Sequence, residues 1–334
     1  MSLFANAYGN FLGSALPYYQ AMPGIITPYG TLLKPGGRVA AYVRSTGAQD
    51  GEDHFASSGN LVRTLQDGLA RCRSGQNDIV YVLPGHTENV STADFFTNLV
   101  AGTQIVGVGR PGSTNNPSLT WTATGATFLL DVANVTLAGL TLNFDGADAI
   151  AAPITVTAAG CSILGCHINH GSSTTTDSLI GITVHTGGDD FTFANNYSFT
   201  TSTAVITNVL SSTAANNNLK ILGNYANVPL TTTNGAFNIG TAAVVSTNLV
   251  MAYNRVVNKS TGTAGVASFT DVAHTGMVHD NYSGVTASSD PDAITSGIVL
   301  AGVTNILVAF FNNFDSAEEK GQQGILGFAA ATAT

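Results

Sequence analysis

The sequence predicts an all-β solenoid, in which short strands and turns stack in successive coils along one axis. The first observation behind this prediction is a short phrase, an apolar run followed by Asn and an aromatic residue, that returns at intervals of 26 to 32 residues. A repeat of this length across more than half of a chain indicates a stacked, one-dimensional architecture. The successive anchor positions of the phrase are Leu140, Cys166, Asn196, Asn224, Asn254, Asn281 and Asn313.

The second observation is the composition of the repeats, which consist of Val, Ile, Thr, Phe, Tyr and Asn with Gly between short apolar runs. β-Branched and aromatic residues favour strands, and Gly, Asn and Ser favour turns. Helical repeats would need Leu, Ala, Glu and Lys on one helical face, and residues 100 to 334 hold no such stretch. Two or three short strands plus turns fill a coil of about 28 residues, and neighbouring coils would stack roughly 4.8 Å apart.

The third observation is the recurrence of Asn at one place in the phrase. An inward or corner ladder of side-chain amides, each bonded to the coils above and below it, would require this pattern, and Asn also tolerates a left-handed backbone at a bend. The alternative is that turn asparagines fall at similar offsets by accident. The predicted ladder consists of Asn196, Asn224, Asn254 and Asn281.

Charge is scarce and unevenly placed in this chain. Only 9% of the 334 residues are charged. Residues 1 to 110 hold seven Lys or Arg and seven acids, whereas residues 111 to 334 hold four and thirteen, a net charge of −9. An acidic shaft argues against nucleic acid or an anionic membrane as its partner.

The cysteines and the first residues point to no cofactor, metal or membrane. Cys72, Cys161 and Cys166 form no disulfide framework and lack zinc-ligand spacing, so we expect buried thiols. The chain starts without the basic residues and long apolar run of a secretory signal. No window of about 18 uninterrupted apolar residues occurs, so we expect no membrane span. Because the secretory signal is missing, we expect synthesis in a cytoplasm.

Residues 1–40 differ from the rest of the chain. They are aromatic and rich in Gly and Pro, carry no charge before Lys34, and show no clear period. This composition predicts an extended arm that docks onto a neighbouring subunit or a larger assembly, with aromatic side chains as anchors. The alternative is an arm that folds back over its own body. The predicted anchors are Phe4, Tyr8, Phe11, Tyr18 and Tyr19.

Residues 41–100 are expected to cap the first coil, because an open solenoid would otherwise expose unpaired strand edges and core. The spacing of Leu61, Leu65 and Leu69 predicts an amphipathic helix over 58–74. The apolar run that ends at Pro84-Gly85 predicts the first strand. Residues 101–325 would then form the shaft, and 326–334 a short tail.

Three segments carry a resemblance to a known family. They are Ser45-Thr-Gly-Ala-Gln-Asp-Gly51, Ile79-Val-Tyr-Val-Leu-Pro-Gly85 and Thr103-Gln-Ile-Val-Gly-Val-Gly109. With the predicted helix and the Asn-aromatic phrases, they resemble the pectate-lyase-like, right-handed parallel β-helix proteins over roughly residues 40 to 320. That family includes phage tailspikes and other virion proteins as well as lyases, hydrolases and inert shafts. The resemblance implies a right-handed parallel β-helix with an N-terminal capping helix and arm, and a homotrimer.

The chemistry that such folds can carry has a weak signature here. Asp189 and Asp190 follow two glycines and are the best candidate for the paired carboxylates of a glycoside hydrolase, although simple turn chemistry explains an Asp pair as well. Gly107 to Gly112 fits G-x-G-x-x-G by letter, but Pro111 and the following strand-like run replace the helix that a dinucleotide site needs. We therefore expect no enzyme.

A weakly charged β-helix with an aromatic arm favours a structural role in a virion. The first hypothesis is a phage capsid decoration or head-spike protein that docks on the major capsid protein, or on another virion protein, through its arm. The second is a tailspike or tail-fibre protein that binds or cleaves a host glycan. A secreted polysaccharide enzyme is a third and weaker hypothesis.

Overall fold

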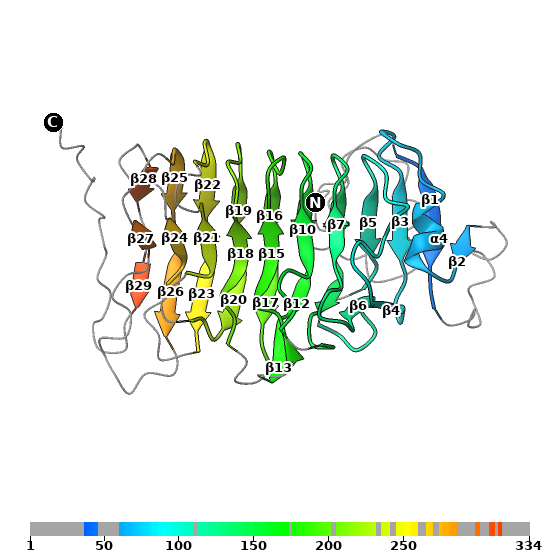
Figure 1. The fold of residues 1–334 in the computed structure, drawn as a ribbon, viewed down its shortest axis with the longest axis horizontal. Helices are drawn as coiled ribbons and strands as arrows, with labels where there is room; N and C mark the ends of the chain where they lie inside the picture. The colour runs from blue at the N-terminus through cyan, green and yellow to red at the C-terminus, as the bar shows by residue number, and fades with distance from the viewer. Residues whose placement is uncertain are drawn as a thin grey trace, which may run out of the picture.

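The computed structural model describes residues 37–45, 60–109, 112–147, 149–173, 176–201, 205–231, 235–240, 245–259, 265–269, 274–285, 298–300, 307–310 and 313–315. Within them the chain forms a right-handed parallel β-solenoid, as the sequence predicts. From β5 to β27 each coil adds one strand to each of three sheets, and strands of one sheet lie side by side in a row along the long axis (Figure 1).

Sheet 1 opens each coil and is the longest of the three. In spatial order its strands are β2 (Leu61–Val62), β1 (Val39–Val43), β3 (Ile79–Val82), β5 (Gln104–Gly107), β8 (Thr136–Ala138), β11 (Ser162–Leu164), β16 (Thr192–Ala194), β19 (Lys220–Leu222), β22 (Leu249–Ala252), β25 (Gly276–His279) and β28 (Leu307–Phe310). Sheet 1 thus begins well before residue 101, since β1 and β3 already belong to it.

Sheets 2 and 3 follow in each coil. Sheet 2 consists of β4 (Thr87–Val90), β6 (Ser118–Trp121), β9 (Thr141–Asn143), β12 (His167–Asn169), β17 (Tyr197–Phe199), β20 (Tyr225–Val228), β23 (Arg255–Asn258), β26 (Tyr282–Val285) and β29 (Asn313–Asp315). Sheet 3 consists of β7 (Phe128–Leu130), β10 (Ile154–Val156), β15 (Ile180–Val184), β18 (Asn208–Ser212), β21 (Phe237–Ile239), β24 (Ala267–Phe269) and β27 (Ile298–Leu300).

One coil carries an insertion. The antiparallel pair β13 (Gly171–Ser173) and β14 (Thr176–Asp177) interrupts the connection from β12 to β15 and projects from the lower side of the solenoid in Figure 1. The Asp145 carboxylate of the preceding coil accepts hydrogen bonds from the backbone N–H and the hydroxyl of Ser172, at 2.8 and 2.6 Å. The base of this hairpin is therefore tied to the solenoid.

The core runs along the inside of the three sheets. Because side chains alternate across a strand, each sheet 1 strand from β5 to β25 directs one residue at the same register position inward. These inward positions are fully buried and stack in register; they are Ile105, Leu137, Ile163, Phe193, Ile221, Met251 and Val278. Trp121 fills the early coils, where its indole packs edge-on against Phe144 and donates to the Pro153 carbonyl at 2.9 Å.

The helix before the first coil is shorter than predicted. Instead of 58–74, α4 covers Leu65–Leu69, and Leu61–Val62 form β2. Tertiary pairing overrides the helical pattern, because Leu61 and Val62 extend sheet 1 beside β1. The helix begins at Thr64, whose hydroxyl accepts the Asp67 N–H at 3.1 Å, rather than near Ser57.

Helix α4 covers the inner side of the first strands. Leu65 and Leu69 are fully buried in the core, as their spacing of four predicts. Gly68 allows this close approach, since a Cβ there would lie 2.9 Å from Val43 and 3.0 Å from Val80. The inside of the first coil is thus closed by a single helical turn.

Candidate functional site

The Asn ladder lies at the bend from sheet 1 to sheet 2, immediately before each sheet 2 strand. Each side-chain oxygen accepts the backbone N–H of the ladder residue one coil earlier, at 2.9 to 3.0 Å. Each side-chain nitrogen donates to a sheet 1 carbonyl of the preceding coil, at 2.8 to 3.0 Å. The four buried residues Asn196, Asn224, Asn254 and Asn281 therefore form one hydrogen-bonded column along the axis.

Neighbouring amides of this column also bond each other directly. Asn196 Nδ2 donates to Asn224 Oδ1 at 3.0 Å, and Asn224 and Asn254 repeat this bond to the next residue at 2.9 Å. The column starts at Cys166, whose backbone N–H is the first donor and whose buried thiol has its pKa raised to about 12 by burial. Buried polar groups of this kind are stabilising only when every donor and acceptor has a partner.

Two details of the ladder differ from the sequence prediction. The left-handed residue at each bend is the one before the ladder residue, at φ between 53° and 67°, and not the ladder Asn itself. These residues are Gly139, Gly165, Asn195, Gly223, Tyr253 and Asp280. In addition, Asn313 pairs with Tyr282 and therefore lies one place after the ladder position. The sequence anchor was one residue off in this coil, because two consecutive Asn residues occur there.

An aromatic column lies on the outside of the same bend. The rings of His167, Tyr197 and Tyr225 stack in successive strands of sheet 2, with centroids 4.8 and 5.2 Å apart. The guanidinium of Arg255 continues the stack between Tyr225, at 5.5 Å, and Tyr282, at 5.2 Å. The sequence signal for this column is the aromatic residue after each Asn, which we used only to define the repeat.

The stacking determines what this column can bind. Ring planes within 25° of each other at about 5 Å spacing cover each other's faces. A sugar ring packs against an exposed aromatic face, so the column offers ring edges, hydroxyl groups and one guanidinium instead of a row of platforms. Phe199 adds a second ring beside Tyr197, stacked at 5.4 Å, and lies 4.4 Å from His167.

The Asp pair lies at a different corner, between sheet 3 and sheet 1. Asp189 Oδ1 accepts the Asn217 N–H at 2.7 Å, and Asp190 Oδ1 accepts from the Asn218 amide at 2.8 Å. Asp190 has a left-handed φ of 57°, and so do the residues at the same place in neighbouring coils. That column of turn residues is Asn77, Gly102, Asn134, Gly160, Asp190, Asn218 and Asn248. Both carboxylates thus bind the backbone and side chains of the next coil.

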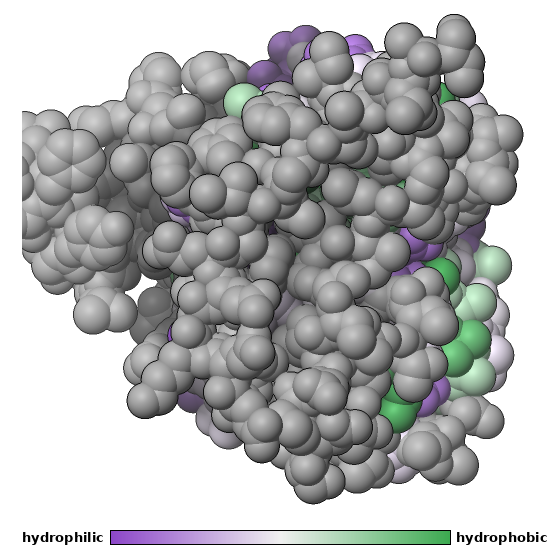
Figure 2. Space-filling view, turned by 90° about the vertical axis from the view of Figure 1, so that its left-hand side faces the viewer, coloured by the Kyte–Doolittle hydropathy of each residue, from purple (hydrophilic) through white to green (hydrophobic). Residues whose placement is uncertain are grey.

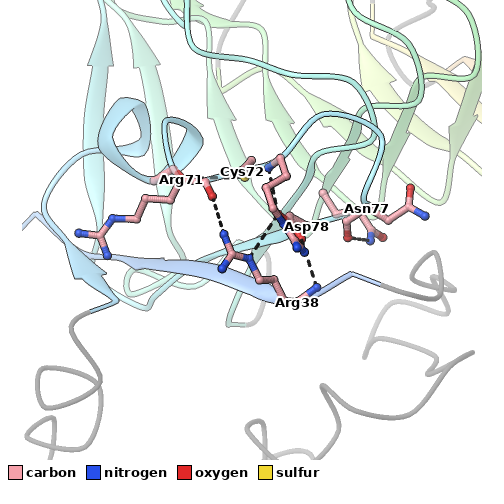
Figure 3. Close-up of polar contacts among 8 residues, drawn as sticks. Arg38, Arg71, Cys72, Asn77 and Asp78 are labelled. Atoms are coloured by element: carbon pink, nitrogen blue, oxygen red, sulfur yellow. Dashed lines mark hydrogen bonds and ion pairs between the residues drawn. The ribbon is translucent and has the colours of Figure 1, made fainter.

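A buried carboxylate near the first strands was not identified from the sequence. The Asp78 side chain is fully buried and accepts from Arg73 at 2.9 and 3.0 Å, and its Oδ2 lies 3.5 Å from Arg38 Nε. Figure 3 shows Arg38 reaching from β1 to Asp78, while its guanidinium also donates to the Arg71 carbonyl at 3.2 Å. These donors, the Arg73 side chain first, lower the Asp78 pKa to about 2. The cluster ties β1 to β3 and to the turn after α4.

The histidines of the first repeats do not converge on a site. His167 lies in the outer aromatic column, whereas His170 is fully buried against Phe144. His170 Nδ1 lies 3.0 Å from Ser178 Oγ, and burial lowers its pKa to about 3. His185 is exposed and lies 2.9 Å from the Thr213 hydroxyl. These positions suit packing and turn bonds.

Several predicted features lie beyond the part that can be described. The docking anchors Phe4, Tyr8, Phe11, Tyr18 and Tyr19 fall outside the described residues, as does the tail 326–334. Among the residues that are described, no three His, Cys, Asp or Glu side chains gather as a metal site. No helix in that part is long and apolar enough to cross a membrane.

Compared with known proteins, the chain matches no family model, and no curated protein or solved structure is significantly similar to it. The chain is a parallel β-solenoid with a buried Asn ladder.

Proposed function

We propose that this chain is a structural protein of a phage virion, a capsid decoration or head-spike protein of the pectate-lyase-like type that docks on the major capsid protein. The observation that carries the proposal is the axial Asn ladder between two continuous parallel sheets. Because coil after coil is joined by backbone and side-chain hydrogen bonds, the solenoid is a stiff rod, suited to project from a surface.

The hydrogen bonding of the Asp pair, the best catalytic candidate, supports a structural role. Asp189 and Asp190 are both engaged by the next coil, and they stand at the left-handed turn that other coils fill with Asn or Gly. A glycosidase needs two carboxylates that face a common sugar, one of them free to carry a proton. Turn residues that bond the adjacent coil explain the pair without catalysis.

The start of the described chain gives the place where the proposed arm would join the solenoid. Residue 37 leads directly into β1, which lies near one end of sheet 1, next to β2 (Figure 1). In the proposal, the arm of residues 1–40 attaches this end of the rod to the capsid. Uncharged aromatic anchors such as Tyr18 and Tyr19 suit a buried protein–protein contact. The family resemblance adds a homotrimer, assembled in the host cytoplasm and carried on the virion.

The experiment is attachment to virus particles that lack this protein. The full chain should sediment with the particles, whereas a chain without residues 1–35 should fold and stay in the supernatant. A matched control, Asn227→Ala on the outside of sheet 2, should attach like the wild type. If the truncated chain still decorates particles, the arm is not the anchor; if the full chain goes to the tail, it is not a head protein.

A second candidate, a tailspike or tail-fibre protein that binds a host glycan, is favoured by the half-buried rings on sheet 2. Tyr197, Phe199 and Tyr225 with Arg255 would offer hydroxyl groups, ring edges and a cation to an acidic saccharide. The test is binding of host surface polysaccharide to wild type, Tyr225→Ala and Asn227→Ala. Loss of binding in Tyr225→Ala alone would support this candidate, and absence of binding by the wild type would reject it.

A further inference from the structure

The outside of sheet 1 carries an apolar column that follows the length of the solenoid. In each sheet 1 strand from β5 to β25, the residue that follows the buried core residue points away from the core, because side chains alternate across a strand. The register places these outward residues directly above one another from β5 to β25. They are Val106, Ala138, Leu164, Ala194, Leu222, Ala252 and His279, the outer column of sheet 1.

This column is more apolar than two other outward columns of the described strands. The parallel outward column of the same sheet is polar in most coils, with Thr136, Ser162 and Thr192. The outward centre of sheet 3 is also polar, with Thr183, Ser211 and Asn238 in register. Packing of the core requires apolar side chains only on the inner face of each sheet. An outer apolar stripe repeated over many coils therefore indicates contact with another surface.

The outer column extends at both ends into larger apolar side chains. Towards the N-terminus it continues into Tyr81 and Tyr42, whose rings stack at 5.9 Å. These two rings, like Val106 and Ala138, are already buried within the chain itself, so the part of the column open to a partner begins at Leu164. Towards the C-terminus it borders Met277, 45% exposed, and Tyr253, 65% exposed, whose ring packs edge-on against His279 at 5.5 Å. Tyr253 keeps a left-handed φ of 59°, which is strained for a bulky residue, at the bend that carries its ring to the surface.

Figure 2 looks onto the side of the molecule that lies to the left in Figure 1, where the C-terminal strands are. Green, hydrophobic atoms gather along one edge of the described surface in this view. Because this view runs along the solenoid axis, it shows that apolar side chains reach the surface on one side of the described part of the solenoid.

The alternation of sizes in the outer column specifies the kind of partner. Leu164 and Leu222 are half-buried ridges, and Ala194 and Ala252 are buried hollows beside them. With strands about 4.8 Å apart, the ridges recur at roughly 9.6 Å along the axis. Hollows at that spacing occur on a partner built from the same stacked strands. A second copy of this chain, shifted by one strand or running antiparallel, meets each ridge with a hollow.

Charge also favours this face for self-association. The chain carries a net charge of −9, so two copies repel each other over most approaches. The sheet 1 strands from β5 to β25 contain no Asp or Glu and one cation, Lys220. The outside of sheet 1, like that of sheet 3, therefore presents no acidic strand residue that would repel the same face of a second copy.

We propose that the outer column of sheet 1 is the surface through which copies of this chain associate. The proposal rests on the oligomer in the proposed function and names its interface, but it does not depend on a location in the head or the tail. In this oligomer the outside of sheet 1 is buried in the interface between copies, and the aromatic side of sheet 2 faces outward.

The test is the mass of the isolated full-length chain in solution, measured by light scattering and sedimentation. The wild type should be an oligomer at micromolar concentration, and the double variant Leu164→Glu/Leu222→Glu should fall two- to threefold in mass to the monomer. The control Asn143→Glu/Asn227→Glu places the same two charges on the outside of sheet 2 and should keep the wild-type mass. Circular dichroism checks that each variant keeps its strand content.

Two results would overturn the proposal. One is a monomeric wild type, and the other is a double variant that keeps the wild-type mass. If the glutamates prevent folding, Leu164→Ser/Leu222→Ser replaces them, since Ser162 already occupies an outward place in this sheet. The mass is measured without particles, so failure here is distinct from failure of the arm to bind a capsid.

Discussion

Replacing Asn224 by Ala tests whether the ladder holds the coils together. The Asn224 side chain takes part in four buried hydrogen bonds: its oxygen accepts from the backbone and side-chain nitrogens of Asn196, and its nitrogen donates to Phe193 O and Asn254 Oδ1. Alanine leaves the Asn196 N–H without this acceptor in the interior. One buried donor without a partner costs about 1–3 kcal/mol, and each further lost bond adds about 1 kcal/mol.

We therefore expect Asn224→Ala to lower the free energy of unfolding by about 3–4 kcal/mol, once the lost packing volume is included. The measurement is guanidinium unfolding followed by far-ultraviolet circular dichroism. Hydrogen exchange of the Asn196 amide, which should become faster, reports the local effect. The matched control Asn227→Ala removes the same side chain from the outside of sheet 2 and should change the free energy by no more than about 0.5 kcal/mol.

The result that would refute this reasoning is equal stability of Asn224→Ala and Asn227→Ala. Asn224→Asp sharpens the test, because a carboxylate can still accept from Asn196 but cannot donate to Phe193 O. A buried carboxylate without a cation is strongly unfavourable, whereas its protonated form donates one hydrogen bond. This variant should thus be less destabilised, relative to wild type, at pH 4 than at pH 7.

Three further predictions concern buried or turn side chains. The His170 pKa is lowered to about 3, so the folded protein holds this imidazole in its neutral form. The stability that wild type has above pH 6.5 should therefore fall as the pH drops toward 3. In acid titrations of His170→Phe this part of the fall should be absent. The Asp78 pKa is lowered to about 2 from 3.8, so its stabilisation is present above about pH 4 and is lost as the pH falls toward 2. Asp78→Asn should therefore lower the melting temperature by several degrees at pH 7 and by little at pH 2. An equal loss at both pH values would contradict the ion cluster. Asp190→Gly should stay within about 1 kcal/mol of wild type in unfolding experiments, because Gly suits the left-handed turn while one bond to Asn218 is lost, and a loss above 3 kcal/mol would show a larger role.

Part of the site could be read from the sequence because a solenoid translates sequence period into spatial stacking. Residues one period apart become neighbours, so Asn196, Asn224 and Asn254 meet once the coil length is known. The aromatic column follows from the same rule, since the residue after each ladder position, a ring or the guanidinium of Arg255, stacks on the one in the next coil. For these residues the position in the repeat is sufficient to predict the tertiary contact.

Contacts that do not follow the period could not be predicted. Asp78 bonds Arg38, 40 residues earlier, in a region before the repeats begin. The strand pairing of Leu61–Val62 with β1 replaced a helix start that the leucine spacing favoured. The left-handed residue fell one place before Asn, because which residue turns at a two-residue bend depends on backbone geometry and not on side-chain type alone.

The sequence by itself determined the all-β stacked architecture, the coil length and the Asn ladder, because each follows from a repeated pattern that only one arrangement satisfies. The tertiary structure decided which face each side chain occupies. It directed the Asp189 and Asp190 carboxylates to the next coil, turned the rings of sheet 2 face to face, and left an apolar column outside sheet 1. The physical reason is the two-residue period of a strand: a shift of one residue moves a side chain from core to surface, and strand register is fixed by pairing across coils.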